Sequence, residues 1–563
     1  MSDTKRSSQQ YPWEENYPVG LDWNMEIPAY PIAQMLDEAA RDYGQAPAFD
    51  FLGFKQNWSE INELTLKMAK GMQALGIEKG TKVGIFLPNC PYFVIAYYAL
   101  MRIGATAVNY NPLYAEKELA NMIEDSETDF MITADLELLF GKMNKMLHDT
   151  RLNHIIVCRF TDILPFPKNL LFKIVKGKEL AEVPEGRRIT WFDKLTDNDG
   201  KPEDVTINPH EDIALYQYTG GTTGLPKGAM LTHANIVANA EQAGAWLGCE
   251  PAQDKMLGVL PFFHVFAMTG VMNIAVRKAM EIVALPRFDM DQTLALIHKK
   301  KPTIFPAVPA IINGINNHKK LSKFDLSSIK YCISGGAPLA VEVKKKFEEK
   351  TGCVAVEGYG LTESSPVLCC NPRVGVNKAG SIGLPFPQTT IEIIDPETGK
   401  EVAPGERGEL CARGPQVMKG YWKRDEETAS TLKEGRLHTG DIAIMDEEGY
   451  FFIVDRIKDM IITNGYNVYP RNVEEAIYEH PSVEECIVAG LPDTQRGEIV
   501  KAWIKRKEGR ELTAEDLKEF LKDKISSMEI PKRIEFRDEP LPKTMIGKLS
   551  RKDIVEEELA KKG

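Results

Sequence analysis

Cysteine is scarce in this chain, and so are the spacings in which cysteine builds scaffolds or metal sites. Nine cysteines are scattered among 563 residues without a CxxC pair. Disulfide scaffolds carry several times that density, and structural zinc motifs use closely spaced pairs. The sequence therefore excludes a disulfide framework, contains no structural zinc motif and predicts a reducing compartment.

Positive charge and long apolar runs are also in short supply. The 69 Lys and Arg residues are outnumbered by 81 Asp and Glu residues, a net charge of −12, so no global field attracts nucleic-acid phosphates. The longest apolar run, Tyr92 to Met101, is about half of the ~20 residues that a membrane-spanning helix needs. The first residues lack the apolar core of a signal peptide. We predict a cytoplasmic protein with no transmembrane helix and no nucleic-acid partner.

What the chain does contain is an ordinary globular composition at enzyme length, with alternating strand-like and helix-like segments. A strand-like run at 82–88 precedes a helical stretch at 91–103, and further pairs follow at 213–218 before a Gly-rich loop, 303–308 before 311–316, and 329–333 before 341–350. This alternation predicts an α/β fold with layered, mostly parallel sheets.

The pattern of predicted elements changes after Gly380. Short β-prone pieces separated by the turn signals PETGK, PGERG and DEEG predict a barrel-like antiparallel subdomain or sheet. Beyond Lys458, two helix-like and two strand-like segments predict a small α+β domain. We expect a large N-terminal domain over residues 1–457 and a small, mobile C-terminal domain over 458–563, joined by a short hinge.

The string YTGGTTGLPKG, Tyr218 to Gly228, packs four glycines, three threonines and a lysine into one loop. Glycines let backbone N–H groups approach an oxyanion, and Lys227 adds positive charge. The loop therefore predicts a polyphosphate site. It is not a P-loop, because Pro226 precedes Lys227 and Gly228 follows it where that motif has Gly and Ser or Thr. A flexible surface loop is the alternative interpretation.

Four further motifs follow in order: EGYGLTE (Glu357 to Glu363), HTGD (His438 to Asp441), DRIKDMIITNGYNVYP from Asp455, and PKTMIGK ending at Lys548. With the Gly-rich loop they resemble the acyl-adenylate-forming enzymes, from about Leu87 to about Arg551. GPQVMKGYW and LHTGDIAIMDEEGYFFIVDRIKD are most similar to the bacterial long-chain fatty acid–CoA ligases. The resemblance implies that ATP activates a fatty acid to an acyl-adenylate plus pyrophosphate, and that coenzyme A then displaces AMP.

The resemblance also implies roles for individual residues. The ATP and AMP site would consist of Tyr218, Thr219, Gly220, Gly221, Thr222, Thr223, Gly224, Lys227, Gly336, Ala337, Pro338, Gly358, Tyr359, Gly360, Thr362, Asp441 and Arg456. Asp441 would accept the ribose hydroxyls, assisted by Arg456. Taken alone, the Asp of a TGD sequence is a turn residue.

The implied catalytic residues are Lys548, His264, Thr362 and Glu363, with Glu363 as the ligand of Mg²⁺. Lys548 would neutralise charge during adenylation. Thr362 and Glu363 would otherwise be loop or helix-cap residues, and His264 in PFFHVF would be a buried histidine packed among phenylalanines. The resemblance places Phe263, His264 and Phe266 at the acyl pocket, Gly465 and Tyr466 at the coenzyme A passage, and Lys458 at the hinge.

Several alternatives remain within this resemblance. A medium-chain or aryl-acid CoA ligase and a carrier-protein-loading enzyme share the adenylate motifs and differ in the acyl pocket. An ATP-binding protein without turnover is disfavoured, because Lys548 and Glu363 are both present. Fatty acid, ATP and coenzyme A are the expected partners, and a homodimer is one candidate assembly.

The segment from Leu164 to Lys178 carries four lysines among apolar residues at roughly helical spacing, a basic patch in an acidic protein. It predicts either peripheral contact with anionic lipid on the inner face of the membrane or an insertion packed on the protein's own surface.

Overall fold

Strands and helices alternate through the first two thirds of the chain, as the sequence pattern predicts. The structure is a computed structural model and describes residues 11–219, 226–463, 466–493, 496–544 and 548–561. The predicted strand and helix at 82–103 are β3 (Lys82–Phe86) and α3 (Pro91–Arg102). Almost every residue of α3 is buried, which explains the unbroken apolar run in its sequence.

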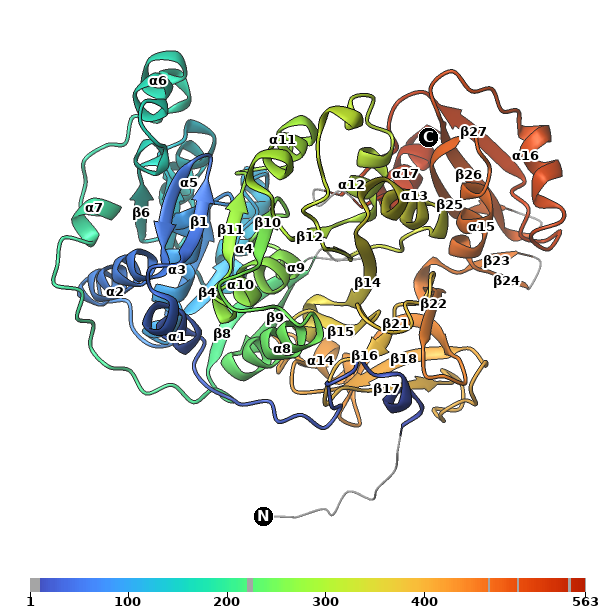
Figure 1. Cartoon of the computed structure of the whole chain (residues 1–563), viewed down its shortest axis with the longest axis horizontal. Coiled ribbons are helices and arrows are strands. Elements are labelled where there is room, and N and C mark those ends of the chain that lie inside the picture. Colours follow the sequence, from blue (N-terminus) through green and yellow to red (C-terminus); the bar gives the residue numbers. More distant parts are fainter. Residues whose placement is uncertain (1–10, 220–225, 464–465, 494–495, 545–547, 562–563) are drawn as a thin grey trace, which may run out of the picture.

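Two large, mostly parallel sheets are formed by the described strands (Figure 1). The first, in spatial order, comprises β16 (Leu384–Pro385), β15 (Val367–Cys370), β14 (Val354–Gly360), β13 (Tyr331–Ser334), β12 (Ile304–Ala307), β10 (Lys255–Gly258), β11 (Glu281–Ala284), β1 (Pro47–Phe51) and β2 (Phe54–Asn57). The second comprises β19 (Gly420–Tyr421), β9 (Lys227–Thr232), β8 (Ile213–Thr219), β4 (Thr106–Asn109), β3, β5 (Phe130–Ala134), β6 (His154–Cys158) and β7 (Ile189–Trp191). The predicted α/β class is confirmed.

Helices cover these sheets and share one continuous apolar core with them. They are α1 (Ala33–Tyr43), α2 (Trp58–Ala74), α4 (Glu116–Ser126), α5 (Glu137–Asp149), α6 (Lys168–Val175), α7 (Phe192–Leu195), α8 (His233–Trp246), α9 (Val265–Ala267), α10 (Ile274–Arg277), α11 (Met290–Lys300), α12 (Pro309–Asn316) and α13 (Val341–Thr351). A π-helical turn, η4 (Met268–Asn273), joins α9 to α10. Since α8 follows β9 directly and Asn239 on α8 bonds to Val367 on β15, α8 connects the two sheets.

The strand at 213–218 does not lead into a helix, so this predicted strand–helix pair is wrong. After the Gly-rich loop the chain returns as β9, antiparallel to β8, with Thr219 opposite Lys227. The six residues 227–232 were missed as a strand because glycine, proline and lysine dominate the loop sequence that precedes them. The loop therefore connects the two strands of a hairpin.

The antiparallel unit after Gly380 is confirmed as a sheet, not as a barrel. Its described strands are β17 (Thr390–Ile394), β18 (Gly408–Arg413), β21 (Arg436–Met445), β20 (Leu432–Lys433) and β22 (Phe451–Arg456), and their pairing follows an open path. The ten-residue β21 is long enough to pair with β18, β20 and β22 at different points along its length, and the pairing of the described strands does not close into a barrel.

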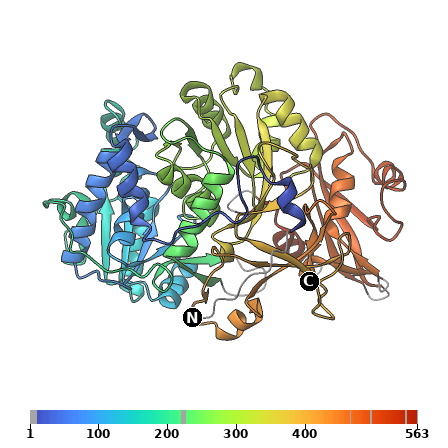
Figure 2. The ribbon, with the colours of Figure 1, turned by 60° about the horizontal axis from the view of Figure 1, so that its bottom comes forward.

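A smaller α+β unit follows η7 (Ile457–Asp459), the turn that contains the predicted domain boundary. It is drawn in orange to red in Figures 1 and 2, and its apolar core is separate from the main one. Its elements are β23 (Ile461–Thr463), β24 (Tyr466–Val468), α15 (Pro470–Tyr478), β25 (Val483–Asp493), β26 (Gly497–Arg506), α16 (Ala514–Leu521), β27 (Arg533–Arg537) and α17 (Arg551–Ala560). No helix within the described ranges combines the length and hydropathy needed to cross a membrane.

The segment before α1 crosses the molecule as an extended strap, dark blue in Figures 1 and 2. The indole N–H of Trp23 donates to the carbonyl of Thr389 at 3.0 Å, and the Tyr17 hydroxyl donates to the carbonyl of Pro385. These bonds attach the strap to the chain beside β16 and β17, more than 360 residues away in sequence. The sequence before Leu87 had given no indication of this.

Candidate active site

The predicted site residues converge on one cleft of about 1680 Å³ between the large sheets and the C-terminal unit. Those that line it are Tyr218, Thr219, Lys227, Phe263, His264, Phe266, Gly336, Ala337, Pro338, Gly358, Tyr359, Gly360, Thr362, Glu363, Asp441, Arg456, Lys458 and Lys548. Gly220, Gly221, Thr222, Thr223, Gly224 and Gly465 lie outside the described residues. Tyr466 is exposed on β24 and is not among the residues lining the cleft.

Asp441 is the most buried carboxylate of the nucleotide-binding prediction, with 4% of its surface exposed. The Tyr359 hydroxyl donates to its Oδ2 at 2.5 Å, and Arg456 Nε donates to its Oδ1 at 3.1 Å. Arg456 stands opposite Asp441 in the β21–β22 ladder. Burial and the neighbouring Asp441 charge raise the pKa of Tyr359, so this phenol stays a neutral donor. Each carboxylate oxygen retains a lone pair for a further donor.

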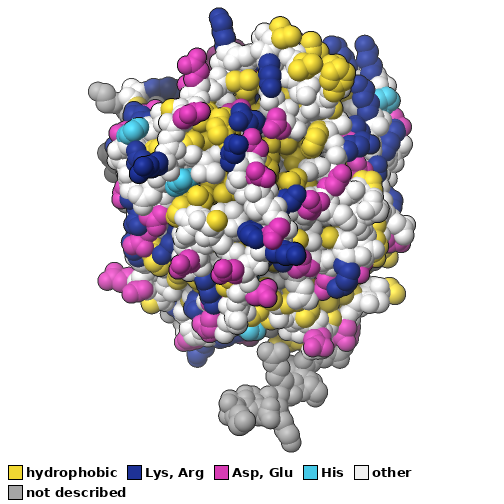
Figure 3. Space-filling view, turned by 90° about the vertical axis from the view of Figure 1, so that its left-hand side faces the viewer, with side chains coloured by type: hydrophobic (Ala, Val, Ile, Leu, Met, Phe, Trp, Pro, Cys, Tyr) yellow, Lys and Arg dark blue, Asp and Glu magenta, His cyan; other side chains and the backbone are white. Residues whose placement is uncertain are grey.

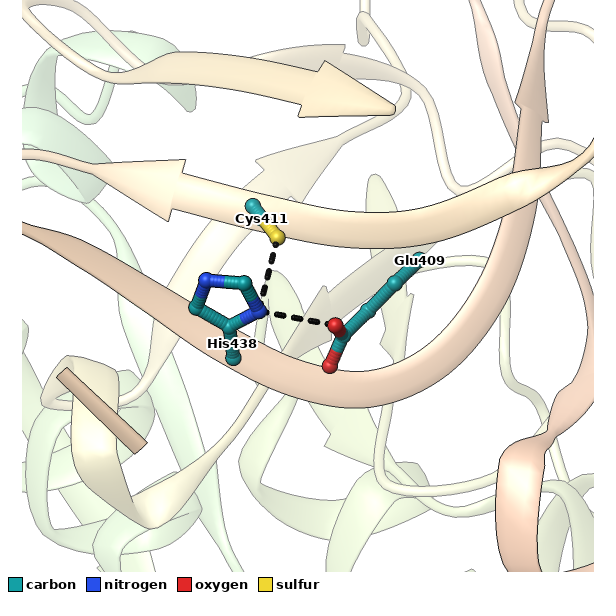
Figure 4. A group of neighbouring side chains, drawn as sticks. All are labelled: Glu409, Cys411 and His438. Atoms are coloured by element: carbon teal, nitrogen blue, oxygen red, sulfur yellow. Dashed lines mark hydrogen bonds and ion pairs between the residues drawn. The ribbon is translucent and has the colours of Figure 1, made fainter. Parts of the chain in front are cut away.

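The irregular part of β21 that presents Asp441 is fixed from the neighbouring strand β18 by Glu409 (Figure 4). One oxygen of Glu409 accepts from Gly440 N at 3.0 Å, and the other accepts from His438 Nδ1 at 2.7 Å. Cys411 Sγ lies 3.4 Å from the same nitrogen. These three residues meet a distance criterion for a metal site, but 2.7 Å is a hydrogen-bond separation and Gly440 already occupies one carboxylate oxygen. The arrangement fixes residues 438–441 of β21 against β18.

Lys548 reaches into the cleft against the backbone of Gly336. A Cβ at Gly336 would lie 2.8 Å from Lys548 Cε, and the φ of +81° also favours glycine. Burial, reinforced by the positive charge of Arg456 and opposed by Asp441, lowers the pKa of Lys548 to about 8. The ammonium is thus held among groups that allow it to lose its proton near neutral pH.

His264 lies half-buried beside Lys548. Burial and the lysine charge lower its pKa to about 3, so the imidazole is neutral. Its Nδ1 accepts a hydrogen bond from Phe266 N at 3.2 Å, which leaves the ring proton on Nε2 as a donor. The prediction that His264 is buried among aromatic side chains and the prediction that it lines the site are therefore compatible.

Glu363 and Lys227 both lie beside the ring of Tyr421 in the cleft. The Tyr421 hydroxyl donates to Glu363 Oε1 at 2.6 Å, and Lys227 Nζ lies 5.2 Å from the centre of the Tyr421 ring. Glu363 offers a hard carboxylate oxygen, the donor type that Mg²⁺ prefers when phosphates and water complete its shell. The residues present therefore fit the predicted metal, with one protein carboxylate.

Phe266 lines the cleft next to Gly270, which belongs to a set of uncharged lining residues that we call the apolar branch: Ala243, Trp246, Gly270, Ile274, Cys370 and Phe386. A Cβ at Gly335 would lie 3.0 Å from its ring, and one at Gly270 would lie 3.2 Å from it. Both glycines therefore leave room for the ring to sit between them.

Sequence reasoning missed a buried ionic network beside the hinge. Arg551, the first residue of α17, donates to Glu474 Oε2 at 2.7 Å, to Asp459 Oδ2 at 3.1 Å and to Asp455 Oδ1 at 3.4 Å. The backbone N–H of Arg471 also bonds to Asp455. Because Asp455 precedes the hinge and Arg551 follows Lys548 by three residues, the network anchors the lysine-bearing segment to β22. Proximity in sequence to Arg456 and Lys548 was the only available signal.

Comparison with known proteins gives consistent matches along the chain. Residues 36–422 match the family described as AMP-binding enzyme, and residues 472–548 match the AMP-binding enzyme C-terminal domain. A long-chain-fatty-acid–CoA ligase of Bacillus subtilis is 45% identical, covering 98% of this chain and 98% of the relative. Another, from Escherichia coli O157:H7, is 35% identical, covering 97% and 98%.

The chain is also similar to solved structures over nearly its whole length. The anthranilate CoA ligase AuaEII in complex with anthranoyl-AMP is 25% identical, with a TM-score of 0.85 and coverage of 96% of this chain and 99% of that chain. ATP-bound MatB from Rhodopseudomonas palustris is 26% identical, with a TM-score of 0.82 and coverage of 93% and 98%. Both matches extend through the C-terminal unit.

Proposed function

Because the chain belongs to the AMP-binding enzyme family, we propose that it is a long-chain-fatty-acid–CoA ligase that forms an acyl-adenylate from ATP and transfers the acyl group to coenzyme A. The 45% identity to the Bacillus subtilis ligase over nearly the whole of both chains is the observation that carries this proposal. The apolar branch beside His264 supplies a place for an alkyl chain.

Adenylation joins two negatively charged reactants, so the site must supply positive charge and fixed geometry. Lys548 places an ammonium where the fatty-acid carboxylate meets the α-phosphate. Neutral His264 donates a hydrogen bond from Nε2 toward the same region without adding charge. Asp441 holds the ribose, and Tyr359 and Gly358 line the adenine side. The carboxylate oxygen then attacks the α-phosphorus, and pyrophosphate leaves.

The phosphate side of the site carries Lys227, Thr362 and Glu363. Lys227 and Thr219 flank the Gly-rich loop and line the cleft, which supports their assignment to the β- and γ-phosphates. Mg²⁺, when held by Glu363, supplies further charge neutralisation. The loop's own residues, 220–225, lie outside the described part of the chain.

Thioester formation requires a different neighbour for the acyl-adenylate. We propose that residues 458–563 rotate about Lys458, withdrawing Lys548 and bringing the segment with Gly465 and Tyr466 to the passage for coenzyme A. Burial lowers the pKa of Lys458, and Arg456 lowers it further, which places the hinge residue inside the charged part of the cleft. The exposure of Tyr466 agrees with a residue that serves only the second arrangement.

A panel of acids tests the proposed function. Purified protein with ATP, Mg²⁺ and coenzyme A should release pyrophosphate and form acyl-CoA most efficiently with long alkyl acids, and less with medium-chain and aryl acids. Pyrophosphate release and acyl-CoA mass are measured together. If pyrophosphate is released but no acyl-CoA forms, the acyl acceptor is not coenzyme A, and a carrier protein would be tested next. Preference for an aryl acid would overturn the long-chain assignment.

We also propose that α6 docks on anionic membrane. The apolar side chains of Leu170, Leu171, Ile174 and Val175 are all exposed, Ile174 by 80%, and Phe166 before the helix is 79% exposed. Positions 170, 171, 174 and 175 share one helix face. Figure 3 shows hydrophobic side chains gathered near the top of this side of the molecule, where α6 stands, with Lys and Arg around them.

Both the charge and the packing of α6 favour a lipid partner. Lys168, Lys173, Lys176 and Lys178 are exposed and border the apolar face, although the protein's net charge is −12. Phe172, on the opposite side, packs against Phe160 with ring centres 5.3 Å apart. The helix is therefore fixed on the fold through one face and presents the other to solvent, as interfacial helices do.

Replacing these four lysines by glutamine is expected to weaken binding to phosphatidylglycerol-containing vesicles by about two to three orders of magnitude, since each contributes about 1 kcal/mol near an anionic surface. Ile174→Ser should weaken it independently. Flotation with anionic and zwitterionic vesicles measures both. The matched control removes four exposed lysines elsewhere: Lys319, Lys345, Lys522 and Lys532. Equal retention of wild-type and both α6 variants on the vesicles would overturn the docking proposal.

A further inference from the structure

The apolar branch of the cleft runs between α8, the η4 turn and β15. Six of the residues that line it are Ala243, Trp246, Gly270, Ile274, Cys370 and Phe386. None of these side chains carries a charge, and Cys370 is a neutral thiol because burial raises its pKa to about 12. Such walls favour methylene groups over polar ones.

Hydrogen bonds between α8 and the β15 strand mark the length of this branch. Near the nucleotide side, Asn239 Nδ2 donates to Val367 O at 2.8 Å, and Val367 N donates back to Asn239 Oδ1 at 3.0 Å. At the far end, Trp246 Nε1 donates to Asn371 O at 3.2 Å. Seven residues of helix separate the two contacts, about 10 Å, and four residues of strand span about 13 Å. The branch therefore extends roughly this far from Val367 to Trp246.

Trp246 closes the far end and is held rigidly there. Besides the bond to Asn371, its ring packs against Phe386 at 5.2 Å and against the edge of Tyr17 at 5.2 Å with an interplanar angle of 90°. Trp246 and Phe386 line the cleft, whereas Tyr17 is not among the described residues that do. Tyr17, carried by the N-terminal strap, thus backs the indole from outside.

We infer that the Trp246 indole is the floor of the acyl site and sets the longest alkyl chain that the protein activates. This inference rests on the proposed ligase function. A chain whose carboxylate lies at His264 and Lys548 passes Phe266 and runs along α8 until its terminal methyl meets the indole. Each methylene that enters the branch before that point should raise kcat/KM by about fourfold, and methylenes beyond it should gain nothing.

Two substitutions on the same helix face should move the limit in opposite directions. Trp246→Ala removes the floor and should extend the preferred length by about two carbons or more, because the space left by a large side chain fills only in part. Ala243→Leu, one turn nearer the carboxylate, should shorten it and cut kcat/KM for the longest acids at least about tenfold while octanoate is spared. Trp246→Phe is the packing control, since it keeps an aromatic floor without the bond to Asn371.

The measurement is acyl-CoA formation by wild-type and variants with saturated acids from eight to twenty-two carbons. Opposite shifts of the length limit support the floor, and unchanged limits in Trp246→Ala and Ala243→Leu overturn it. If Trp246→Ala does not fold, as its circular dichroism would show, Ala243→Leu decides alone: a shorter limit supports the floor and an unchanged one overturns it. Failure of the wild-type protein to activate any alkyl acid would instead overturn the proposed function.

Discussion

Lys548→Ala is expected to slow acyl-adenylate formation by about 10²- to 10³-fold, the usual cost of removing one preorganised electrostatic group, while thioester formation from supplied acyl-adenylate keeps most of its rate. Lys548 is the cation placed against Gly336 and beside His264 in this arrangement of the domains. Fatty-acid-dependent exchange of pyrophosphate into ATP measures the first half-reaction. Synthetic acyl-adenylate with coenzyme A measures the second.

Lys552 supplies the matched control for this substitution. It lines the same cleft on α17, four residues from Lys548, and lies 3.9 Å from Glu556. Lys552→Ala removes one positive charge from the same segment and should leave both half-reactions nearly unchanged. Equal loss of both half-reactions in Lys548→Ala would contradict the alternation of domains, and equal loss in the two variants would contradict a specific role for Lys548.

The same lysine predicts a pH dependence. Its pKa is lowered to about 8, so the ammonium is present below pH 8 and is lost above it. The kcat/KM of adenylation, which reports the free enzyme, should fall tenfold per pH unit above about 8, whereas thioester formation should not share this fall. Lys548→Arg retains its charge across that range and should remove the decline, even at lower overall rate.

The sequence predicted the fold where hydrophobic periodicity is strong and local. β3, α3, α12 and α13 fall within a few residues of the expected ranges because their burial is decided by neighbours in the same parallel layer. β9 was missed because its partner across the hairpin, not its own composition, makes it a strand. The open sheet was expected to be barrel-like since short strands and turns specify antiparallel pairing but do not specify closure.

The candidate site was predictable where a motif carries the chemistry on consecutive residues. Tyr359, Glu363 and Asp441, which were predicted from the motifs EGYGLTE and HTGD, all line one cleft. Residues that act through tertiary contact gave no such pattern. Asp455, Glu474 and Arg551 form their network across a hundred residues of sequence, and Trp246, the proposed floor of the acyl branch, packs against Tyr17 of the N-terminal strap, more than 200 residues away in sequence.

The acyl branch and the Arg551 network lie differently with respect to the hinge. The acyl branch is lined by residues of α8, the η4 turn and β15. All three precede the hinge, so a bound alkyl chain would contact elements outside the C-terminal unit. The Arg551 network spans the hinge, because Arg551 bonds to Asp455 before it and to Asp459 and Glu474 after it. The proposed rotation of the C-terminal unit would therefore exchange the groups at the carboxylate while leaving the length of the acyl site unchanged.

Asp441→Ala should reduce kcat/KM for ATP by about 10²-fold or more, because two hydrogen bonds to a charged group, each of about 1.5 to 3 kcal/mol, are lost with the carboxylate. The effect should fall on the nucleotide: with ATP saturating, dependence on fatty-acid concentration should be little changed. Asp441→Asn keeps the shape and one acceptor oxygen, and should lose about tenfold. Steady-state kinetics with ATP varied at fixed fatty acid measures all three proteins.

Nucleotides that lack ribose hydroxyls separate this role from a general loss of structure. Asp441 anchors Tyr359 and Arg456 as well as facing the ribose, so its removal loosens two neighbours and lowers the rate by itself. A wild-type protein that binds both hydroxyls through Asp441 should prefer ATP over 2′,3′-dideoxy-ATP by a large factor, and Asp441→Ala should nearly abolish that preference. If the variant discriminates between the two nucleotides as strongly as the wild-type protein, the carboxylate only supports the site and another group binds the ribose.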